Sequence, residues 1–234
     1  TRINNAEYGL QSGTAVSLDL LGLNEIAFDG EDLVLGAMVR LQEIVDRDGL
    51  PAALRSAATQ VYSRNVRNMA TVGGNIAAAA PDSVLNPLLL AYGSELLLAD
   101  TGTVPLSRYL QSGMDDLILS VRIPACRRPA AVRRIARSSA APALVTAAAI
   151  LTLEAGKVTA AGVVLGGLQL LPVRLEEIER QLVSGKLAPG RELQKAVEAV
   201  VEVREDYRCS IAYKRYIAGV IADECIARCL GGVK

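Results

Sequence analysis

The sequence has no histidine, and among its 234 residues only one is Phe and seven are Tyr. Without imidazole the chain has no His-based catalytic triad, no His-ligated zinc and no imidazole for acid–base catalysis. Hydrophobic residues make up 51% of the chain but aromatic residues only 3%, so the predicted core is aliphatic. No paired-carboxylate constellation stands out either, so we predict no catalytic residue and no metal ligand in this chain.

The sequence also lacks an excess of charge of either sign, because it has 25 basic and 25 acidic residues. This balance gives no indication of a nucleic-acid partner. The four cysteines form no C-x-x-C pair, which fits reduced cytosolic thiols better than a disulfide framework or an iron–sulfur site. A cytoplasmic protein is therefore expected.

No segment has the pattern of a signal peptide or of a membrane span. The uncharged runs 138–153 and 158–173 contain Pro and Gly and are too short for a span. The G-x-G-x-x-G and G-x-x-x-x-G-K-[ST] patterns are also missing. A Rossmann dinucleotide site is therefore not expected, and a P-loop is excluded.

Hydrophobic patterns and turn residues predict an α+β protein with two lobes. Strands are predicted at 32–38, 95–99, 117–123, 143–153 and 158–165, the last two forming a hairpin. Helices are predicted at 39–46, 51–58, 88–92, 175–183, 193–203 and 211–230. Pro51 is expected at the first helical position, and the helix at 88–92 has Asn86 as its expected N-cap and Gly93 as its expected stop.

The segment 64–76 concentrates two arginines, three asparagines, a threonine and a glycine pair within an apolar chain. Gly73 and Gly74 are expected to adopt positive φ and to let backbone amides form an anion-binding nest. Thr71 and Asn75 add side chains that hydrogen-bond to a phosphate, a ribose or the edge of a heterocycle. Most glycine pairs are only tight turns. The surrounding sequence is what favours a cofactor loop here.

That context resembles a known family. The pattern R-N-x-A-T-x-G-G-N ends at Asn75, and Ser-Val-Leu-Asn-Pro follows at 83–87. Further along, Leu-Ser-Val-Arg-Ile-Pro at 119–124, Leu-Gly-Gly at 165–167 and Pro-Val-Arg at 172–174 complete the series. Over nearly its whole length, the chain resembles the FAD-binding medium subunit of the molybdenum hydroxylases, the xanthine dehydrogenase and carbon monoxide dehydrogenase group.

The resemblance implies a two-part FAD-binding domain over residues 1–124, truncated at its start, and a C-terminal domain over 130–234 in which helices pack on an antiparallel sheet. The linker around 125–129 is the expected boundary. The family holds the flavin diphosphate on two loops, and the end of the first, A-G-G-T-x-L, resembles the start of this chain. By this resemblance, the cofactor-binding residues are Thr1, Arg2, Ile3, Asn4, Thr71, Val72, Gly73, Gly74, Asn75, Ala78, Asp82, Ile118 and Arg134.

Several of these assignments have a structural alternative. The family usually has an aspartate where this chain has Val84; Asp82 either supplies that carboxylate or caps its own loop. Arg134 matches a family lysine near the flavin ring, where a cation stabilises negative charge, or it is a solvated strand arginine. Ile118 matches a position that touches the isoalloxazine, although an aliphatic strand residue needs no functional reason. Tyr62 either stacks near the ring or belongs to the core.

As a function, the resemblance implies an electron-transfer subunit that binds FAD. Electrons come from a molybdenum cofactor on a large subunit through [2Fe-2S] clusters on a small subunit, reach FAD here, and pass to NAD+ or another acceptor. The alternative is a structural or assembly subunit that keeps the fold without flavin, which Val84 and the incomplete first loop favour. A free-standing flavin oxidase fits less well, because the C-terminal half offers few polar groups for catalysis.

Overall fold

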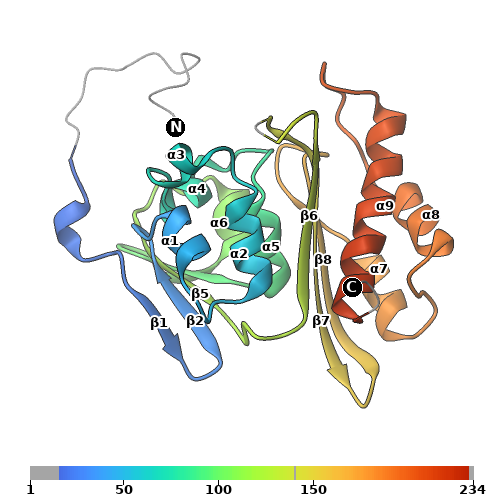
Figure 1. Cartoon of the computed structure of the whole chain (residues 1–234), viewed down its shortest axis with the longest axis horizontal. Helices are drawn as coiled ribbons and strands as arrows, with labels where there is room; N and C mark the ends of the chain where they lie inside the picture. The colour runs from blue at the N-terminus through green and yellow to red at the C-terminus, as the bar shows by residue number, and fades with distance from the viewer. Residues whose placement is uncertain (1–15, 140, 232–234) are drawn as a thin grey trace.

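The computed structural model describes residues 16–139 and 141–231 and shows two sheets with helices between and beside them. In Figure 1 the first lobe, with the five-stranded sheet and its helices, lies beside a four-stranded sheet, whose far face carries three further helices. Thr1, Arg2, Ile3 and Asn4, predicted to end a flavin loop, lie outside the described residues. Among the residues described, no helix is long and apolar enough to cross a membrane.

The first sheet has the order β1-β2-β5-β3-β4, with antiparallel neighbours throughout. Its strands are β1 (Ile26–Asp29), β2 (Asp32–Gly36), β3 (Glu95–Leu98), β4 (Gly102–Pro105) and β5 (Ile118–Ile123). Leu35, Val121 and Leu96 lie side by side across its centre and are fully buried, so one face of the sheet forms the floor of the first core. β2, β3 and β5 match the predicted strands, whereas the sequence patterns did not indicate β1 or β4.

Short helices fill the first lobe on the inner side of this sheet. After a single 3-10 turn, η1 (Asp19–Leu21), they are α1 (Leu41–Asp46), α2 (Ala52–Thr59), α3 (Arg64–Arg67), α4 (Val72–Ala78), α5 (Leu85–Tyr92) and α6 (Leu106–Ser112). The predicted start of α5 is wrong, because Val84 is the capping residue and Asn86 already lies inside the helix. Ser83 takes over the capping bond by accepting the N–H of Asn86. Pro51 precedes α2 as its capping residue and is not its first helical residue.

The second sheet has the order β6-β7-β8-β9 and is also antiparallel. It contains β6 (Ala130–Ala136), β7 (Ala143–Glu154), β8 (Lys157–Gly166) and β9 (Val173–Arg174), and is covered on one face by α7 (Glu176–Val183), α8 (Arg191–Val200) and α9 (Ile211–Cys229). The predicted β7–β8 hairpin forms, with Ala155 and Gly156 at positive φ in its turn. β6, which the patterns missed, carries two adjacent arginines.

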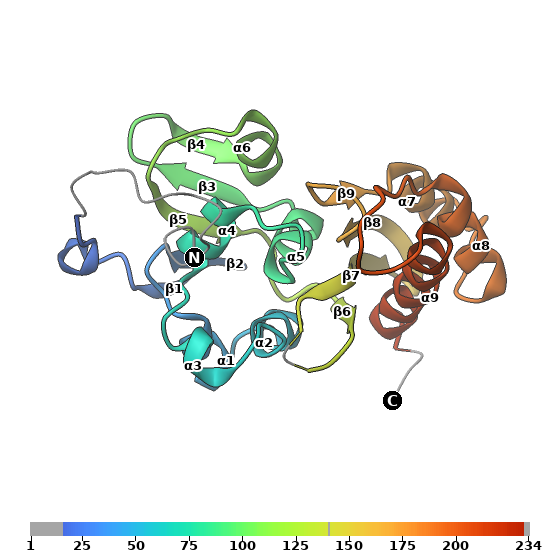
Figure 2. The ribbon, with the colours of Figure 1, turned by 90° about the horizontal axis from the view of Figure 1, so that it is seen from above.

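Helices α2 and α5 pack on the other face of this second sheet, as Figure 2 shows, so they lie between the two sheets. The first nine residues of β7 are buried without alternation, because both faces of the strand are covered. At Gly162 the approach is so close that a Cβ would lie 2.4 Å from the carbonyl oxygen of Ala91 in α5. Val132, Ala148 and Val164 of the second sheet therefore belong to the core of the first lobe.

A charged cluster built around the buried Lys214, with Asp206 and Arg208 partly buried, fixes the loops at one end of the second sheet. The Nζ of Lys214, a residue with 1% exposure, donates to Asp206 at 2.7 Å and to the carbonyl of Gly167 at 3.0 Å. Arg208 donates to the same carboxylate and to the carbonyl of Ala143. Burial by itself would raise the pKa of Asp206, but the hydrogen bonds from Lys214 and Arg208 outweigh it and lower that pKa.

Candidate functional site

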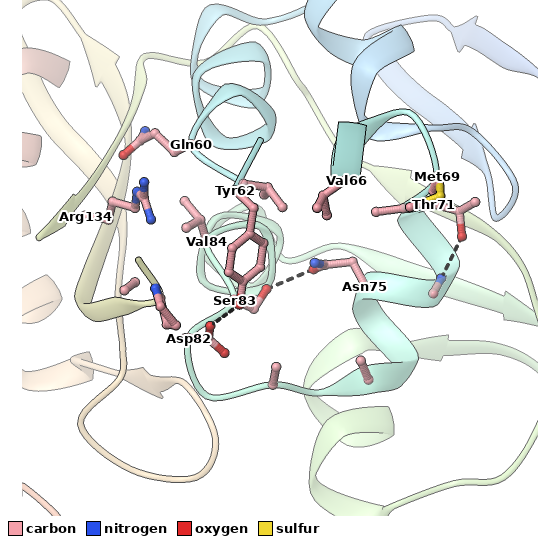
Figure 3. Close-up of a pocket in the computed structure, with 17 residues that line it drawn as sticks. Gln60, Tyr62, Val66, Met69, Thr71, Asn75, Asp82, Ser83, Val84 and Arg134 are labelled. Carbon is pink, nitrogen blue, oxygen red and sulfur yellow. Dashed lines mark hydrogen bonds between the residues drawn. The ribbon is translucent and has the colours of Figure 1, made fainter. Parts of the chain in front are cut away.

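A cavity of about 280 Å³ opens where the start of α4, the loop before α5 and the β6–β7 connection meet (Figure 3). Both lobes contribute to its lining. Its polar wall is formed by Tyr62, Thr71, Asn75, Asp82, Ser83 and Arg134. The apolar side chains of Val66 and Met69 also line it, Met69 beside Thr71, and the Met69 residue is 73% exposed. The cavity is thus a mixed polar and apolar site, as small-molecule sites in proteins usually are.

The glycine pair predicted as a loop forms the first turn of helix α4 instead. Thr71 is the capping residue of α4, and its hydroxyl accepts the N–H of Gly74 at 3.1 Å. Neither Gly73 nor Gly74 is among the glycines with positive φ, so that expectation is wrong. The reason is that the threonine cap starts a regular helix, in which glycine has helical backbone angles like any other residue.

The predicted anion-binding nest is also wrong, because other groups already occupy the amides. Val72 donates its N–H to the carbonyl of Val39 at 2.9 Å, and Gly73 donates to the carbonyl of Ala37 at 2.8 Å. Together with the bond from Gly74 to Thr71, this satisfies the first three N–H groups of the helix. A ligand at this helix must therefore be held mainly by side chains.

Close packing gives the two glycines different roles. A Cβ on Gly73 would lie 2.7 Å from the Cβ of Ala37, so this glycine lets α4 pack against the segment that follows β2. A Cβ on Gly74 would lie 2.9 Å from the Thr71 hydroxyl oxygen. Gly74 is exposed and lines the cavity, so its missing side chain leaves room beside the hydroxyl.

Thr71 and Asn75 present hydrogen-bond donors to this space from adjacent turns of α4. The oxygen of Thr71 already accepts from Gly74, which leaves the hydroxyl proton to donate outward. The Oδ1 of Asn75 accepts from the Ser83 hydroxyl at 2.9 Å, as the dashed line in Figure 3 shows. Among the described residues, nothing bonds the Asn75 amide nitrogen, so this group is available to an acceptor on a ligand.

Asp82 is the acidic group of the site, and Tyr62 orients it. The phenol of Tyr62 donates to Oδ2 of Asp82 at 2.6 Å across the cavity (Figure 3). Burial and this hydrogen bond raise the pKa of Tyr62, so the phenol stays protonated and remains a donor. Tyr62 has φ of 37°, a left-handed backbone conformation that is uncommon for a non-glycine residue and is over-represented at functional sites.

Arg134 reaches the cavity from β6, but its guanidinium is also tied to the chain. It donates to the carbonyls of Ala141 and Ser139 in the β6–β7 connection. Pro142 from the same connection and Ala143 at the start of β7 line the cavity. Arg134 therefore shapes this wall through its bonds to the β6–β7 connection and also brings a positive charge to the cavity.

Of the remaining predicted site residues that the structure describes, only Ala78 lines this cavity, whereas Val72, Gly73 and Ile118 do not. Ile118 is buried in β5 and lies with Gly73 on a second hollow of about 420 Å³ on the other side of α4. Thr71 and Gly74 line both hollows. Val72 points into the core with 1% exposure, whereas Ala78 lies on the cavity wall.

Ser83 was not among the predicted site residues, although this serine links Asn75 to the first turn of α5. A capping signal was available, because serine three residues before the helical Asn86 is typical of a helix start. For metals, no group of three or more His, Cys, Asp or Glu side chains is placed to hold an ion within the described residues.

Comparison with known families gives two matches that together cover most of the chain. Residues 6–126 match the FAD binding domain in molybdopterin dehydrogenase, and residues 130–229 match the CO dehydrogenase flavoprotein C-terminal domain. Fold and matches together define the class as medium subunits of molybdenum hydroxylases, which are oxidoreductases with an FAD-binding domain. The chain belongs to the family of the FAD binding domain in molybdopterin dehydrogenase.

Individual relatives agree with this assignment. The uncharacterized protein YgfM of Escherichia coli K12 is 40% identical, over 92% of this chain and 80% of its own length. The carbon monoxide dehydrogenase medium chain of Afipia carboxidovorans is 28% identical, over 90% of this chain and 77% of its own. A crystal structure of the cyanide-inactivated Cu,Mo-CO dehydrogenase superposes with a TM-score of 0.80 at 25% identity, covering 90% of this chain and 79% of that one.

Proposed function

We propose that this chain holds one FAD across the start of helix α4 and relays electrons from partner subunits to a final acceptor, NAD+. The observation that carries the proposal is the pair of outward donors on Thr71 and Asn75, with the Asp82 carboxylate facing the same cavity. Donors suit the acceptor-rich diphosphate and ribityl groups of a flavin dinucleotide, and a carboxylate suits its hydroxyls.

The shape of the site fits a long ligand. The cavity on one side of α4 and the hollow on the other both reach Thr71 and Gly74, so one elongated molecule spans both without crossing the core. Gly74 keeps the crossing point open, since a Cβ there would fill the space at the Thr71 hydroxyl. These features support the proposal that the ligand is a long dinucleotide such as FAD.

In this proposal the bound flavin supplies the redox chemistry, and the residues of the chain bind and orient it. Thr71 and Asn75 donate hydrogen bonds to its phosphate or ribityl oxygens. Asp82, held by Tyr62, accepts from a hydroxyl through the carboxylate oxygen that Tyr62 leaves open. Arg134 adds a positive charge at the wall, which favours negative charge on a reduced flavin.

The partners follow from the relatives. The matching proteins include medium and beta subunits of carbon monoxide, glyceraldehyde and caffeine dehydrogenases. We accordingly propose an iron–sulfur small subunit and a molybdenum-binding large subunit as partners of this chain. NAD+ as final acceptor extends this proposal and rests on the resemblance to xanthine dehydrogenases.

A second candidate is an assembly subunit that keeps the fold without flavin. Val84 favours it, because this residue is 3% exposed, belongs to the core and offers no acceptor where the family usually has an aspartate. The occupied amides of α4 favour it as well.

Adding FAD to the purified protein, removing free flavin and recording the visible spectrum distinguishes the two. If the chain is an electron-transfer subunit, the wild type should bind one FAD per chain. Gly74→Val should bind much less FAD, while the melting temperature of its apo-protein should stay close to that of the wild type. A protein that stays colourless at saturating FAD, yet co-purifies with a molybdenum and an iron–sulfur subunit, would establish the assembly role. Rapid reduction of NAD+ by the isolated complex tests the acceptor separately.

A further inference from the structure

We infer that Ser83 is a positioning residue that fixes which end of the Asn75 amide faces the ligand. The inference rests on the proposed function, because it concerns the same cavity. It adds a role for a residue that has no direct part in holding the cofactor in that proposal.

The amide of Asn75 has two ends of almost identical shape but opposite hydrogen-bonding character. Its oxygen only accepts, and its nitrogen only donates. If the oxygen faced the cavity, the site would present an acceptor to an acceptor-rich dinucleotide. The orientation of this one group therefore decides whether the start of α4 attracts or repels phosphate and ribityl oxygens.

A directional chain of hydrogen bonds sets that orientation. The N–H of Asn86 donates to the Ser83 hydroxyl oxygen at 3.1 Å, and the hydroxyl donates to Oδ1 of Asn75 at 2.9 Å. A backbone N–H can only donate, so it fixes one acceptor position on the serine oxygen and leaves the single hydroxyl proton for another partner. Asn75 supplies that acceptor, and its NH₂ group is directed to the cavity.

Burial makes this chain rigid. Ser83 is 6% exposed, so its hydroxyl has little access to bulk water as a substitute acceptor. If the Asn75 amide were reversed, the serine proton would be left without a partner in a buried place, which is unfavourable. The Asn86 N–H at the start of helix α5 thus sets the orientation of the Ser83 hydroxyl, and this hydroxyl sets the orientation of the Asn75 amide on α4.

Thermodynamic coupling between Ser83 and Asn75 tests this inference, with FAD affinity and apo-protein melting as separate readouts. Ser83→Ala should weaken FAD binding about tenfold, at the upper end of the range for the loss of one hydrogen bond. Asn75→Ala should weaken it at least as much. In the Asn75→Ala background, Ser83→Ala should have no further effect on affinity, although the loss of the α5 cap should lower the melting temperature in both backgrounds.

Two substitutions check the direction of the amide. Asn75→Asp keeps the bond from Ser83 but replaces the outward donor by an acceptor, so it should bind FAD more weakly than Asn75→Ala. Ser83→Thr retains the hydroxyl and should restore wild-type affinity. Ser63→Ala is the matched control, because Ser63 caps α3 beside the cavity without contacting Asn75. It should leave the affinity unchanged.

The inference is overturned if Ser83→Ala binds FAD like the wild type while Asn75→Ala does not, or if the two effects simply add. It is equally overturned if Asn75→Asp keeps wild-type affinity. If Ser83→Ala does not fold, Ser83→Cys, which keeps the volume but donates weakly, takes its place and should weaken binding in the same direction. Failure of the wild type to bind FAD would instead refute the proposed function, so the two failures are distinguishable.

Discussion

Two neighbouring groups of polar side chains are built on opposite plans. In the cluster of Lys214, Asp206 and Arg208, donors and acceptors bind one another and the nearby backbone carbonyls. In the cavity, the Thr71 hydroxyl accepts one internal bond and keeps its proton to donate, while Asn75 and Asp82 each use one of two polar atoms internally and keep the other for a ligand. The first group is complete by itself, whereas the second is oriented but incomplete.

The two groups lie next to each other, because the carbonyl that Arg208 binds belongs to Ala143, which lines the cavity. The cluster of Lys214, Asp206 and Arg208, which we call the closed cluster, therefore fixes part of the cavity wall. The cavity residues Thr71, Asn75 and Asp82 form the open group. Internal bonding of charges places loops in one group, whereas partial bonding preserves binding capacity in the other. The first group should therefore affect the stability of the apo-protein, and the second its affinity for FAD.

Breaking the closed cluster should have the largest effect. Asp206→Asn leaves the buried ammonium of Lys214 without its counter-ion, so we expect a loss of about 3 kcal/mol in the free energy of unfolding. Urea denaturation of the apo-protein measures it. Glu205→Gln, at the exposed neighbour, is the control and should change little. Equal losses in the two variants would show that the cluster does not stabilise the fold.

The same cluster predicts a pH dependence. Because the pKa of Asp206 is lowered in the folded state, its contribution is present above the unfolded pKa of about 4 and is lost as the pH falls further. In the wild type, stability should thus decline below about pH 4, while Asp206→Asn should show a shallower decline. Parallel profiles would contradict this.

Substitutions at Gly73 and Gly74 should have effects of intermediate size, one on the free energy of unfolding and the other on FAD affinity. Gly73→Ala forces a Cβ against Ala37 and should destabilise the protein by about 1–3 kcal/mol. Gly74→Ala crowds only the Thr71 hydroxyl and gains about 1 kcal/mol in helix propensity, so stability should hold. FAD affinity of Gly74→Ala should nevertheless fall about tenfold. Denaturation and FAD titration of both variants measure these effects. An equal loss of stability in the two variants would contradict the different roles of Gly73 and Gly74.

The smallest effect on FAD affinity is expected from Tyr62, whose phenol binds Asp82 of the cavity. Tyr62→Phe removes the hydrogen bond that orients Asp82, so FAD affinity should fall two- to threefold, about 0.5 kcal/mol. Stability near neutral pH should not change. The wild type should lose stability above about pH 10, because the unfolded phenol ionises before the folded one, and the variant should lose less. Burial also raises the pKa of Tyr92, so Tyr92 should cause part of the stability loss at high pH in both the wild type and the variant.

Elements bounded by strong local signals could be predicted from the sequence. The end of α5 at Gly93 and the β7–β8 hairpin are examples, since both depend on residues that adopt positive φ. β6 escaped prediction because its paired arginines look like a charged loop, and only the pairing with β7 makes it a strand. β1 is partly exposed and depends on β2 in the same way.

The site shows the same division. The motif groups Thr71, Gly74 and Asn75, and the structure brings all three to one cavity, because their spacing within one helix turn is local. The expected amide nest failed because the carbonyls of Ala37 and Val39 take the amides, and these come from a segment more than thirty positions earlier in the chain. No local pattern reveals such a partner. The role of Ser83 depends likewise on two helices meeting.

The placement of α2 and α5 between the sheets has a consequence for how the molecule unfolds. The two family matches meet near residues 126–130, yet the core does not divide there, since Val132, Ala148 and Val164 pack with the first lobe. Separating the halves would expose a broad apolar face on each of them. The chain should accordingly melt in a single cooperative transition. A ligand held at the junction, by stabilising that one transition, would protect both halves from proteolysis at once.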